Sequence, residues 1–326
     1  MRAMILAAGL GTRLQPLTHL KAKPALPVLG RPVIAWLLEF LRASGIKEVA
    51  INVHYRPESI KEAVQRYGPG DMKIEYFTEK RPLGTGGGIA AARHFLSRSD
   101  PAIIIAGDML LDVNLQPLIE EHLRQEALCT LLLQDDAEKA KTFGSIGLDA
   151  HGRVKRIAQR LNLGDETERG VFVGLRLVSP KAFSALPGFS PDEAFEDLTD
   201  WFGPLITSGD TRIRGHRLPP TSLAWTPVGT PEEYLHANLS PSSPSYLSKE
   251  QLLFPGTQQV GEAHDVILGP GATVGQGALL ERCVVWENET VPPNFAATGG
   301  VFAHGRFYSC TEDKNSKSYK ENPRDE

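Results

Sequence analysis

The stretch that most constrains this chain is its start, a short apolar run that ends in a glycine-rich turn. The sequence MILAAGLGTRL occupies residues 4–14, and a lysine–proline pair follows at Lys23 and Pro24. The apolar run predicts a buried strand, and glycines let main-chain N–H groups approach an anion closely. Arg13 and Lys23 add charges that suit phosphate groups. We therefore expect this loop to wrap the triphosphate of a nucleotide.

Helices and strands alternate through the first third of the chain. The expected helices cover residues 32–41, 57–67 and 87–96, and the expected strands cover 48–53, 73–77 and 102–106. Such alternation predicts the α/β class, with a Rossmann-like, mostly parallel mixed sheet flanked by helices. The later pattern has expected strands at 129–133, 145–148, 153–158, 171–178 and 211–217, with helices at 195–207 and 232–238. We expect this part to extend the same sheet.

A hexapeptide repeat follows a Ser/Pro-rich stretch. Between residues 268 and 283 an apolar residue recurs every six positions, with glycine after the first two, which predicts a short, left-handed parallel β-helix. The expected units are a main domain at 1–239, a linker at 240–262, the repeat at 263–300 and a disordered tail at 301–326. Because so few repeats cannot bury a core alone, the coil should pack on the main domain, on a second copy or on a homologue.

Composition excludes several classes of function. The formal net charge of −4 offers no electrostatic case for binding nucleic acid. The first apolar run is too short for a signal peptide or a membrane span, and no later run qualifies. The 3 cysteines are far apart and show no metal-ligand spacing, which favours a reducing compartment. We expect a cytoplasmic protein that binds neither nucleic acid nor membrane.

The glycine-rich loop fits one nucleotide-binding signature and not two others. A dinucleotide fingerprint needs a third glycine where Leu14 stands, and the Gly-Lys-Ser/Thr of a Walker A loop is absent. The run GTR at 11–13, PLT at 16–18 and KPALPV at 23–28 instead resembles the signature of the sugar-1-phosphate nucleotidyltransferases. That resemblance implies the nucleotide-diphospho-sugar transferase fold, and nucleotide contacts from Ala7, Ala8, Gly9, Gly11 and Thr12.

Further segments extend the resemblance to about residue 238. The sequence EKRPLGTGGG at 79–88 resembles the loop that holds the nucleobase, which implies contacts from Glu79, Pro82, Leu83, Gly84 and Thr85. Its PLGTGG form is similar to guanylyltransferases and some uridylyltransferases. By the same resemblance Asp108 would hold Mg²⁺, and Gly144, Val173 and Gly174 would line the sugar pocket. The segment 225–235 resembles the closing segment of the family.

Three positions depart from the family pattern. Pro227 stands where the resemblance implies a second metal-binding aspartate, although Asp112 follows Asp108 at a distance of four residues. The run AQRL at 158–161 replaces the usual Glu-Lys-Pro, so the usual sugar-binding glutamate and lysine are missing. Ala22 replaces a proline.

The resemblance implies that an NTP and a sugar 1-phosphate give an NDP-sugar and pyrophosphate, with Mg²⁺ as cofactor. Arg13 would steady the leaving pyrophosphate, and Lys23 would lie against the α-phosphate and the incoming phosphate. GTP with mannose 1-phosphate is the favoured pair. A heptose 1-phosphate with GTP and an N-acetylated sugar 1-phosphate with UTP stay open. A non-catalytic, nucleotide-sugar-binding regulatory homologue is the alternative that Pro227 favours.

Overall fold

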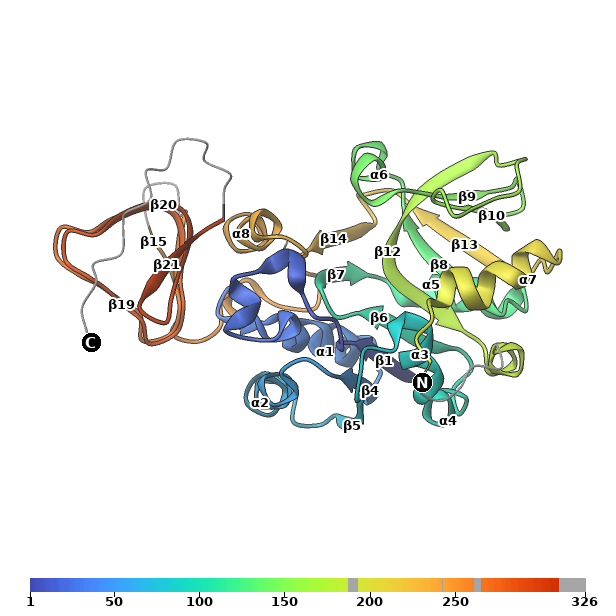
Figure 1. Ribbon diagram of the computed structural model, residues 1–326, viewed down its shortest axis with the longest axis horizontal. Coiled ribbons are helices and arrows are strands. Elements are labelled where there is room, and N and C mark those ends of the chain that lie inside the picture. Colours follow the sequence, from blue (N-terminus) through green and yellow to red (C-terminus); the bar gives the residue numbers. More distant parts are fainter. Residues whose placement is uncertain (187–192, 242, 261–264, 311–326) are drawn as a thin grey trace.

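The computed structural model describes residues 1–186, 193–241, 243–260 and 265–310, and it has a large α/β unit followed by a small β unit (Figure 1). A ten-stranded sheet forms the centre of the large unit. Its strands are β1 (Arg2–Leu6), β4 (Glu48–Val53), β5 (Lys73–Thr78), β6 (Ala102–Ala106), β8 (Cys129–Gln134), β9 (Ile146–Leu148), β10 (Val154–Ile157), β11 (Leu161–Asn162), β12 (Glu168–Val178) and β13 (Ile213–Leu218).

The sheet is parallel in its first half and mixed beyond it. The order is β11-β10-β9-β12-β6-β1-β4-β5, with β8 beside β12 and β13 beside β8. Strands β6, β1, β4 and β5 run parallel, whereas β12 is antiparallel to β6, β8 and β9. The predicted α/β class with a mixed sheet is confirmed. The carboxyl ends of β1, β4 and β6 meet at one edge, which is where ligands bind in open α/β sheets.

Helices cover both faces of this sheet (Figure 1). They are α1 (Val33–Ala43), α2 (Pro57–Tyr67), α3 (Gly84–Ala91), α4 (Arg93–Leu96), α5 (Leu115–Arg124), α6 (Ala137–Phe143), α7 (Gly203–Thr207) and α8 (Pro231–Leu239). The helix expected at 87–96 begins earlier, at Gly84, and is interrupted at Ala92. The helix expected at 195–207 is a wide π-type turn at Asp197–Phe202 followed by α7. No helix among the described residues is both long and apolar enough to cross a membrane.

A second, two-stranded sheet was not expected from the sequence. Strand β7 (Met109–Val113) pairs antiparallel with β14 (Leu223–Pro227), and Pro227 lies opposite Met109. The N–H of Val228 donates to the main-chain oxygen of Asp108 at 2.8 Å. This pairing brings the closing segment, over a hundred residues away in sequence, beside the end of β6.

The C-terminal unit is a small mixed sheet with a parallel centre. Strands β16 (Val266–Leu268), β18 (Leu279–Val285) and β20 (Ala296–Ala303) run parallel, flanked by antiparallel β15 (Gln258–Val260) and β21 (Arg306–Ser309). Strands β17 (Thr273–Val274) and β19 (Thr290–Val291) form a separate parallel pair. The start of the disordered tail expected at 301–326 is wrong, because β20 and β21 continue the sheet through Ser309, with Val301 and Ala303 buried. Residues 311–326 lie outside the described residues.

The two units pack on each other through a shared core. The indole Nε1 of Trp286 donates to the Tyr234 hydroxyl at 3.0 Å, and that hydroxyl donates to the carbonyl of Pro27 at 2.6 Å. The expected linker is not a free spacer, because the Tyr246 ring packs at a tilt against the Phe40 ring and the N–H of Phe254 donates to the carbonyl of Leu29 at 3.0 Å. The C-terminal unit therefore packs against the main unit. Such packing is expected because so short a repeat cannot bury a core alone.

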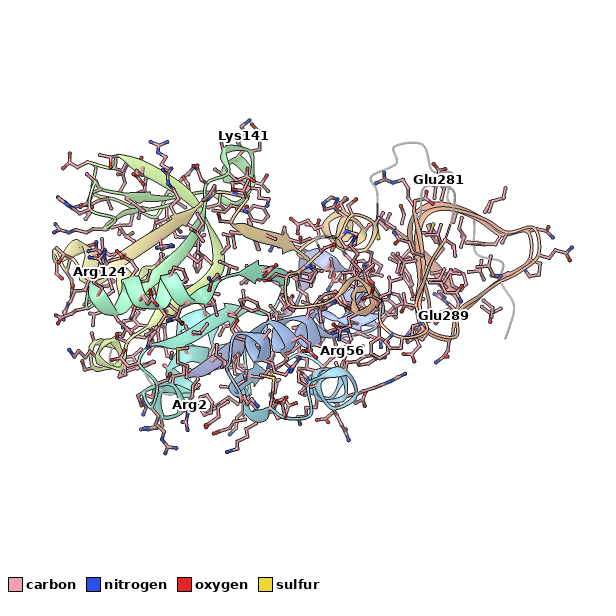
Figure 2. The ribbon with its side chains drawn as sticks, turned by 180° about the vertical axis from the view of Figure 1, so that it is seen from behind. Arg2, Arg56, Arg124, Lys141, Glu281 and Glu289 are labelled. Atoms are coloured by element: carbon pink, nitrogen blue, oxygen red, sulfur yellow. The ribbon has the colours of Figure 1, made fainter. Side chains whose placement is uncertain are left out.

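A cavity of about 810 Å³ lies at this junction and is lined by both units. Figure 2 shows Arg56 near the junction, Glu289 on the C-terminal unit, and Arg124 at the far end of the main unit. None of the sequence-predicted site residues lines this cavity.

Candidate active site

A second cavity, of about 700 Å³, opens at the carboxyl ends of β1, β4 and β6. It gathers every sequence-predicted site residue except Gly144 and Val173. Its lining includes Ala7, Ala8, Gly9, Gly11, Thr12, Arg13, Lys23, Glu79, Pro82, Leu83, Gly84, Thr85, Asp108 and Gly174. This convergence from five separate segments makes the cavity, rather than the larger one at the junction, the candidate active site.

The phosphate-loop candidate is shaped by two polar side chains outside it. Asn52, at the end of β4, accepts from the N–H of Ala7 at 2.8 Å. The hydroxyl of Thr18 donates to the carbonyl of Gly11 at 3.0 Å. Gly11 has a φ of +67°, and a Cβ there would lie 2.8 Å from the methyl group of Thr18. Only glycine therefore fits this turn.

An ion pair joins the two predicted phosphate and metal residues. The Lys23 ammonium lies 2.8 Å from the Asp108 carboxylate, and their side chains are 11% and 40% exposed. Lys23 stands in a 3-10 turn at Lys23–Ala25, and Asp108 follows Gly107 at the end of β6. The turn after β6 is tight, because a Cβ on Gly107 would lie 2.6 Å from the carbonyl of Leu6. A cation and a carboxylate thus meet where phosphates are expected.

The side chains around Asp108 suit a cation that takes most of its ligands from water molecules and substrate phosphates. No group of three or more His, Cys, Asp or Glu side chains among the described residues could hold a metal. Asp112 does not join Asp108, because its carboxylate accepts from the N–H and the hydroxyl of Ser245 at 2.6 and 2.8 Å. Pro227 adds no side-chain oxygen. Mg²⁺ needs only one or two carboxylates beside substrate phosphates, so Asp108 alone fits it.

The nucleobase-loop candidate is held by a buried carboxylate. Glu79, 5% exposed, accepts from the Asn52 amide at 2.6 Å and from the N–H of Leu83 at 3.0 Å. The carbonyl of Leu83 accepts from the N–H of Phe195 at 3.0 Å. A Cβ on Gly88 would lie 2.6 Å from the Asn52 amide, so that glycine is required by close packing. Glu79 and Asn52 thus connect this loop to the phosphate loop.

The opposite wall comes from β12 and the segment after it. Gly174 has a φ of +83°, and a Cβ there would lie 2.9 Å from Ala106. Val173 points into the core and is 1% exposed. Gly144 ends α6 and packs near Ala158, which does line the cavity. The expected sugar-pocket set is therefore only partly at the cavity surface.

Sequence reasoning missed several lining residues. Asn52 and the buried ion pair Arg176–Asp197 are the clearest, and Arg160 lines the cavity near the missing Glu-Lys-Pro. The available signal was a polar residue among apolar neighbours, since Asn52 lies near the end of the apolar strand β4 and Arg176 stands between the apolar residues Leu175 and Leu177 of β12. A buried polar group must find a partner, but the sequence does not say which.

Cysteine chemistry plays no part in this site. All 3 cysteines are buried and unpaired with one another. Burial raises the pKa of the Cys129 thiol well above its usual range and that of Cys310 to about 12. Because the thiolate is the nucleophile, these buried thiols are inert near neutral pH.

Comparison with known proteins agrees with the geometry. The sequence profile described as Nucleotidyl transferase matches residues 2–241. The chain belongs to this family. It is 30% identical over 306 residues to a mannose-1-phosphate guanylyltransferase of Mycobacterium tuberculosis, over 89% of this chain and 80% of that protein. It is 24% identical over 341 residues to a UTP–glucose-1-phosphate uridylyltransferase of Synechocystis, over 90% of this chain and 84% of that protein.

Solved structures agree on the fold of this nucleotidyltransferase. HddC from Yersinia pseudotuberculosis superposes with a TM-score of 0.59 at 24% identity, over 72% of this chain and 97% of HddC. The same values hold for HddC complexed with GMP-PN. The predicted resemblance to sugar-1-phosphate nucleotidyltransferases is confirmed by the family match and by these relatives.

Proposed function

We propose that this sugar-1-phosphate nucleotidyltransferase uses GTP and mannose 1-phosphate and releases GDP-mannose and pyrophosphate. The observation that carries the transfer chemistry is the pairing of Lys23 with Asp108 at 2.8 Å in the cavity between the two glycine-rich loops. The nucleobase and sugar follow from the PLGTGG form of residues 82–87 and from relatives named as mannose-1-phosphate guanylyltransferases.

The transfer needs position and charge more than covalent chemistry. An oxygen of the sugar phosphate attacks the α-phosphorus in line, the bond from that phosphorus to the β-phosphate oxygen breaks, and pyrophosphate leaves. The loop of residues 7–13 wraps the triphosphate, and Arg13 steadies the leaving group. Lys23 exchanges part of its contact with Asp108 for phosphate oxygens and neutralises the charge that both substrates bring.

Asp108 is the residue that would hold Mg²⁺. When bound, the ion supplies positive charge to the phosphate oxygens. Asp108 is partly exposed beside Lys23, so it can exchange its ammonium partner for a cation. The two loops order the nucleotide, with Asn52 and Glu79 fixing the distance between them.

A second candidate is a nucleotide-sugar-binding homologue without turnover. Pro227 and the engagement of Asp112 by Ser245 favour it, because both remove a second carboxylate from the metal site. The C-terminal repeat would then serve assembly with an active homologue. We also propose that this repeat is one short parallel β-helical coil, which its parallel centre supports.

Pyrophosphate release separates the candidates. The four NTPs are mixed with Mg²⁺ and with mannose 1-phosphate, glucose 1-phosphate, a heptose 1-phosphate or N-acetylglucosamine 1-phosphate. Release with GTP and mannose 1-phosphate above all other pairs supports the proposal. Release with UTP above GTP overturns the guanylyl assignment. Nucleotide binding with no release from any pair supports the non-catalytic candidate.

A further inference from the structure

A partly buried network of hydrogen bonds joins the nucleobase-loop candidate to the opposite wall of the cavity. The Thr85 hydroxyl lies 2.6 Å from a carboxylate oxygen of Asp197 and 2.6 Å from one of Glu196. It also accepts from the N–H of Asp197 at 3.2 Å. A hydroxyl has one proton to donate, so Thr85 serves one carboxylate at a time while held by the main chain of the wall.

Asp197 is fixed in turn by Arg176 of β12. The two side chains form an ion pair, and each is 3% exposed. The Arg176 guanidinium packs over the Phe172 ring at 5.1 Å. Its Nε is buried without a hydrogen-bond partner among the described residues. Asp197 therefore provides the main compensation for the charge of Arg176, and such a pair has few alternative positions.

The main chain of the same wall segment, at Phe195, also hydrogen-bonds the nucleobase-loop candidate. The N–H groups of Gly86 and Gly87 donate to the carbonyl of Phe195 at 3.0 and 3.3 Å. A Cβ on Gly84 would lie 2.4 Å from that carbonyl, and one on Gly86 would lie 2.3 Å from the Phe195 ring. These two glycines are thus explained by contact with the wall, not by approach to a phosphate.

We infer that Thr85 is a positioning residue for the donor nucleotide, held by the Asp197–Arg176 pair. This inference rests on the proposed function, because it takes residues 82–85 as the nucleobase loop. The Asp197–Arg176 pair fixes the Thr85 side chain. Thr85 and Phe195 in turn fix the turn at Leu83 and Gly84, and this turn sets the position of the nucleobase. The network acts on nucleotide affinity and leaves the transfer step unchanged.

The test uses Thr85→Val, which keeps the size of the side chain and removes its hydroxyl. We expect the Kd of the nucleotide, measured by calorimetry without sugar phosphate, and its KM to rise about tenfold. We expect kcat and the KM of the sugar phosphate to change less than about twofold, as for lost ground-state binding. Thr85→Ser should restore nucleotide binding.

Two further variants separate positioning from stability. Glu166→Gln breaks the ion pair of 2.6 Å between Glu166 and Arg156. Neither of these residues lines the cavity, so this variant should leave nucleotide binding unchanged. The double variant Arg176→Met/Asp197→Leu replaces the buried pair by apolar groups, which proteins often tolerate. It should stay folded and still weaken nucleotide binding.

Nucleotide Kd values for Thr85→Val within twofold of the Glu166→Gln control would overturn the inference. So would a weakened Thr85→Val that Thr85→Ser fails to rescue. If the wild-type protein releases no pyrophosphate with any pair, the proposed function fails, while calorimetry of nucleotide binding still decides the role of Thr85.

Discussion

Lys23 and Asp108 form an ion pair of 2.8 Å that joins a 3-10 turn near the start of the chain to the end of β6. The pair lies between the two glycine-rich loops, and 85 residues separate its members in sequence. In the proposed reaction each member exchanges part of this contact, Lys23 for phosphate oxygens and Asp108 for a cation.

Replacing Lys23 by Met should lower kcat/KM by about 10²- to 10³-fold, the effect of removing one group that stabilises transition-state charge. Because Asp108 is partly exposed, its lost partner should cost little stability. Steady-state pyrophosphate release measures the first effect and thermal unfolding the second. Lys21→Met is the matched control: Lys21 lines the junction cavity instead, so activity within about threefold of wild type is expected. Equal losses in the two variants would contradict the assignment.

Changing Pro227 to Asp should lower the Mg²⁺ concentration needed for half-maximal activity. Pro227 lies opposite Met109, the residue that follows Asp108, so a new carboxylate adds negative charge near the proposed ligand. We expect a shift of about tenfold, since ligand charge tunes affinity for such cations. Pro227→Asn removes the proline without adding charge and serves as the control. If Pro227→Asp needs as much Mg²⁺ as Pro227→Asn, or more, the result would argue against Asp108 as the metal residue.

Asn52→Ala should destabilise the protein and weaken nucleotide binding together. Asn52 serves the N–H of Ala7 and the carboxylate of Glu79, both buried. Leaving such groups unsatisfied costs about 1–3 kcal/mol each, so the free energy of unfolding should fall by about 2 kcal/mol or more. Denaturant unfolding and nucleotide titration check both effects. Asn162→Ala, at an exposed position of strand β11, should change neither property. A similar loss of stability and of nucleotide binding in that variant would contradict the role given to Asn52.

The strand ends and their charged followers could be predicted from the sequence because they are encoded locally. An apolar run, the glycine after it and the charge that follows are neighbours in the chain, which is how the loop at Gly9–Arg13 and Asp108 were found. Helix α2 has the bounds that were predicted from the sequence, Pro57–Tyr67.

The side chains that shape the site could not be paired in advance because their partners are remote. Asn52 meets Glu79 across 27 residues, and Thr85 meets Asp197 across 112. Gly84 was predicted only as a contact of the nucleobase, and the sequence does not show that Gly84 and Gly86 both lie against Phe195. Strand β12 contains the buried Arg176, whose role only the fold explains.

Stability should fall on acidification because of His122. This side chain is 1% exposed, and its ring nitrogens lie 2.8 and 3.0 Å from the hydroxyls of Thr130 and Ser179. Burial lowers the pKa of His122 from 6.5 to about 4. Between these pH values the unfolded chain binds a proton that the folded chain does not bind. The contribution of neutral His122 to the free energy of unfolding is therefore complete above pH 6.5 and is lost as the pH falls toward 4.

The loss from His122 is at most about 3 kcal/mol. Denaturant unfolding at pH 7 and pH 4.5 measures it, with His122→Gln as the comparison. The variant should be less stable at pH 7 and should lose less stability on acidification than the wild type. Equal losses in both proteins would show that other groups cause the acid sensitivity.

The central claim is that the cavity between the two loops transfers a nucleotidyl group to a sugar phosphate. The direct measurement follows GTP labelled at its α-phosphate, mixed with mannose 1-phosphate and Mg²⁺, by chromatography of the products. We expect label to enter GDP-mannose in equal amount to the pyrophosphate released, and Lys23→Met to slow both by about 10²- to 10³-fold. Binding of GTP without label transfer to any sugar 1-phosphate would contradict the central claim.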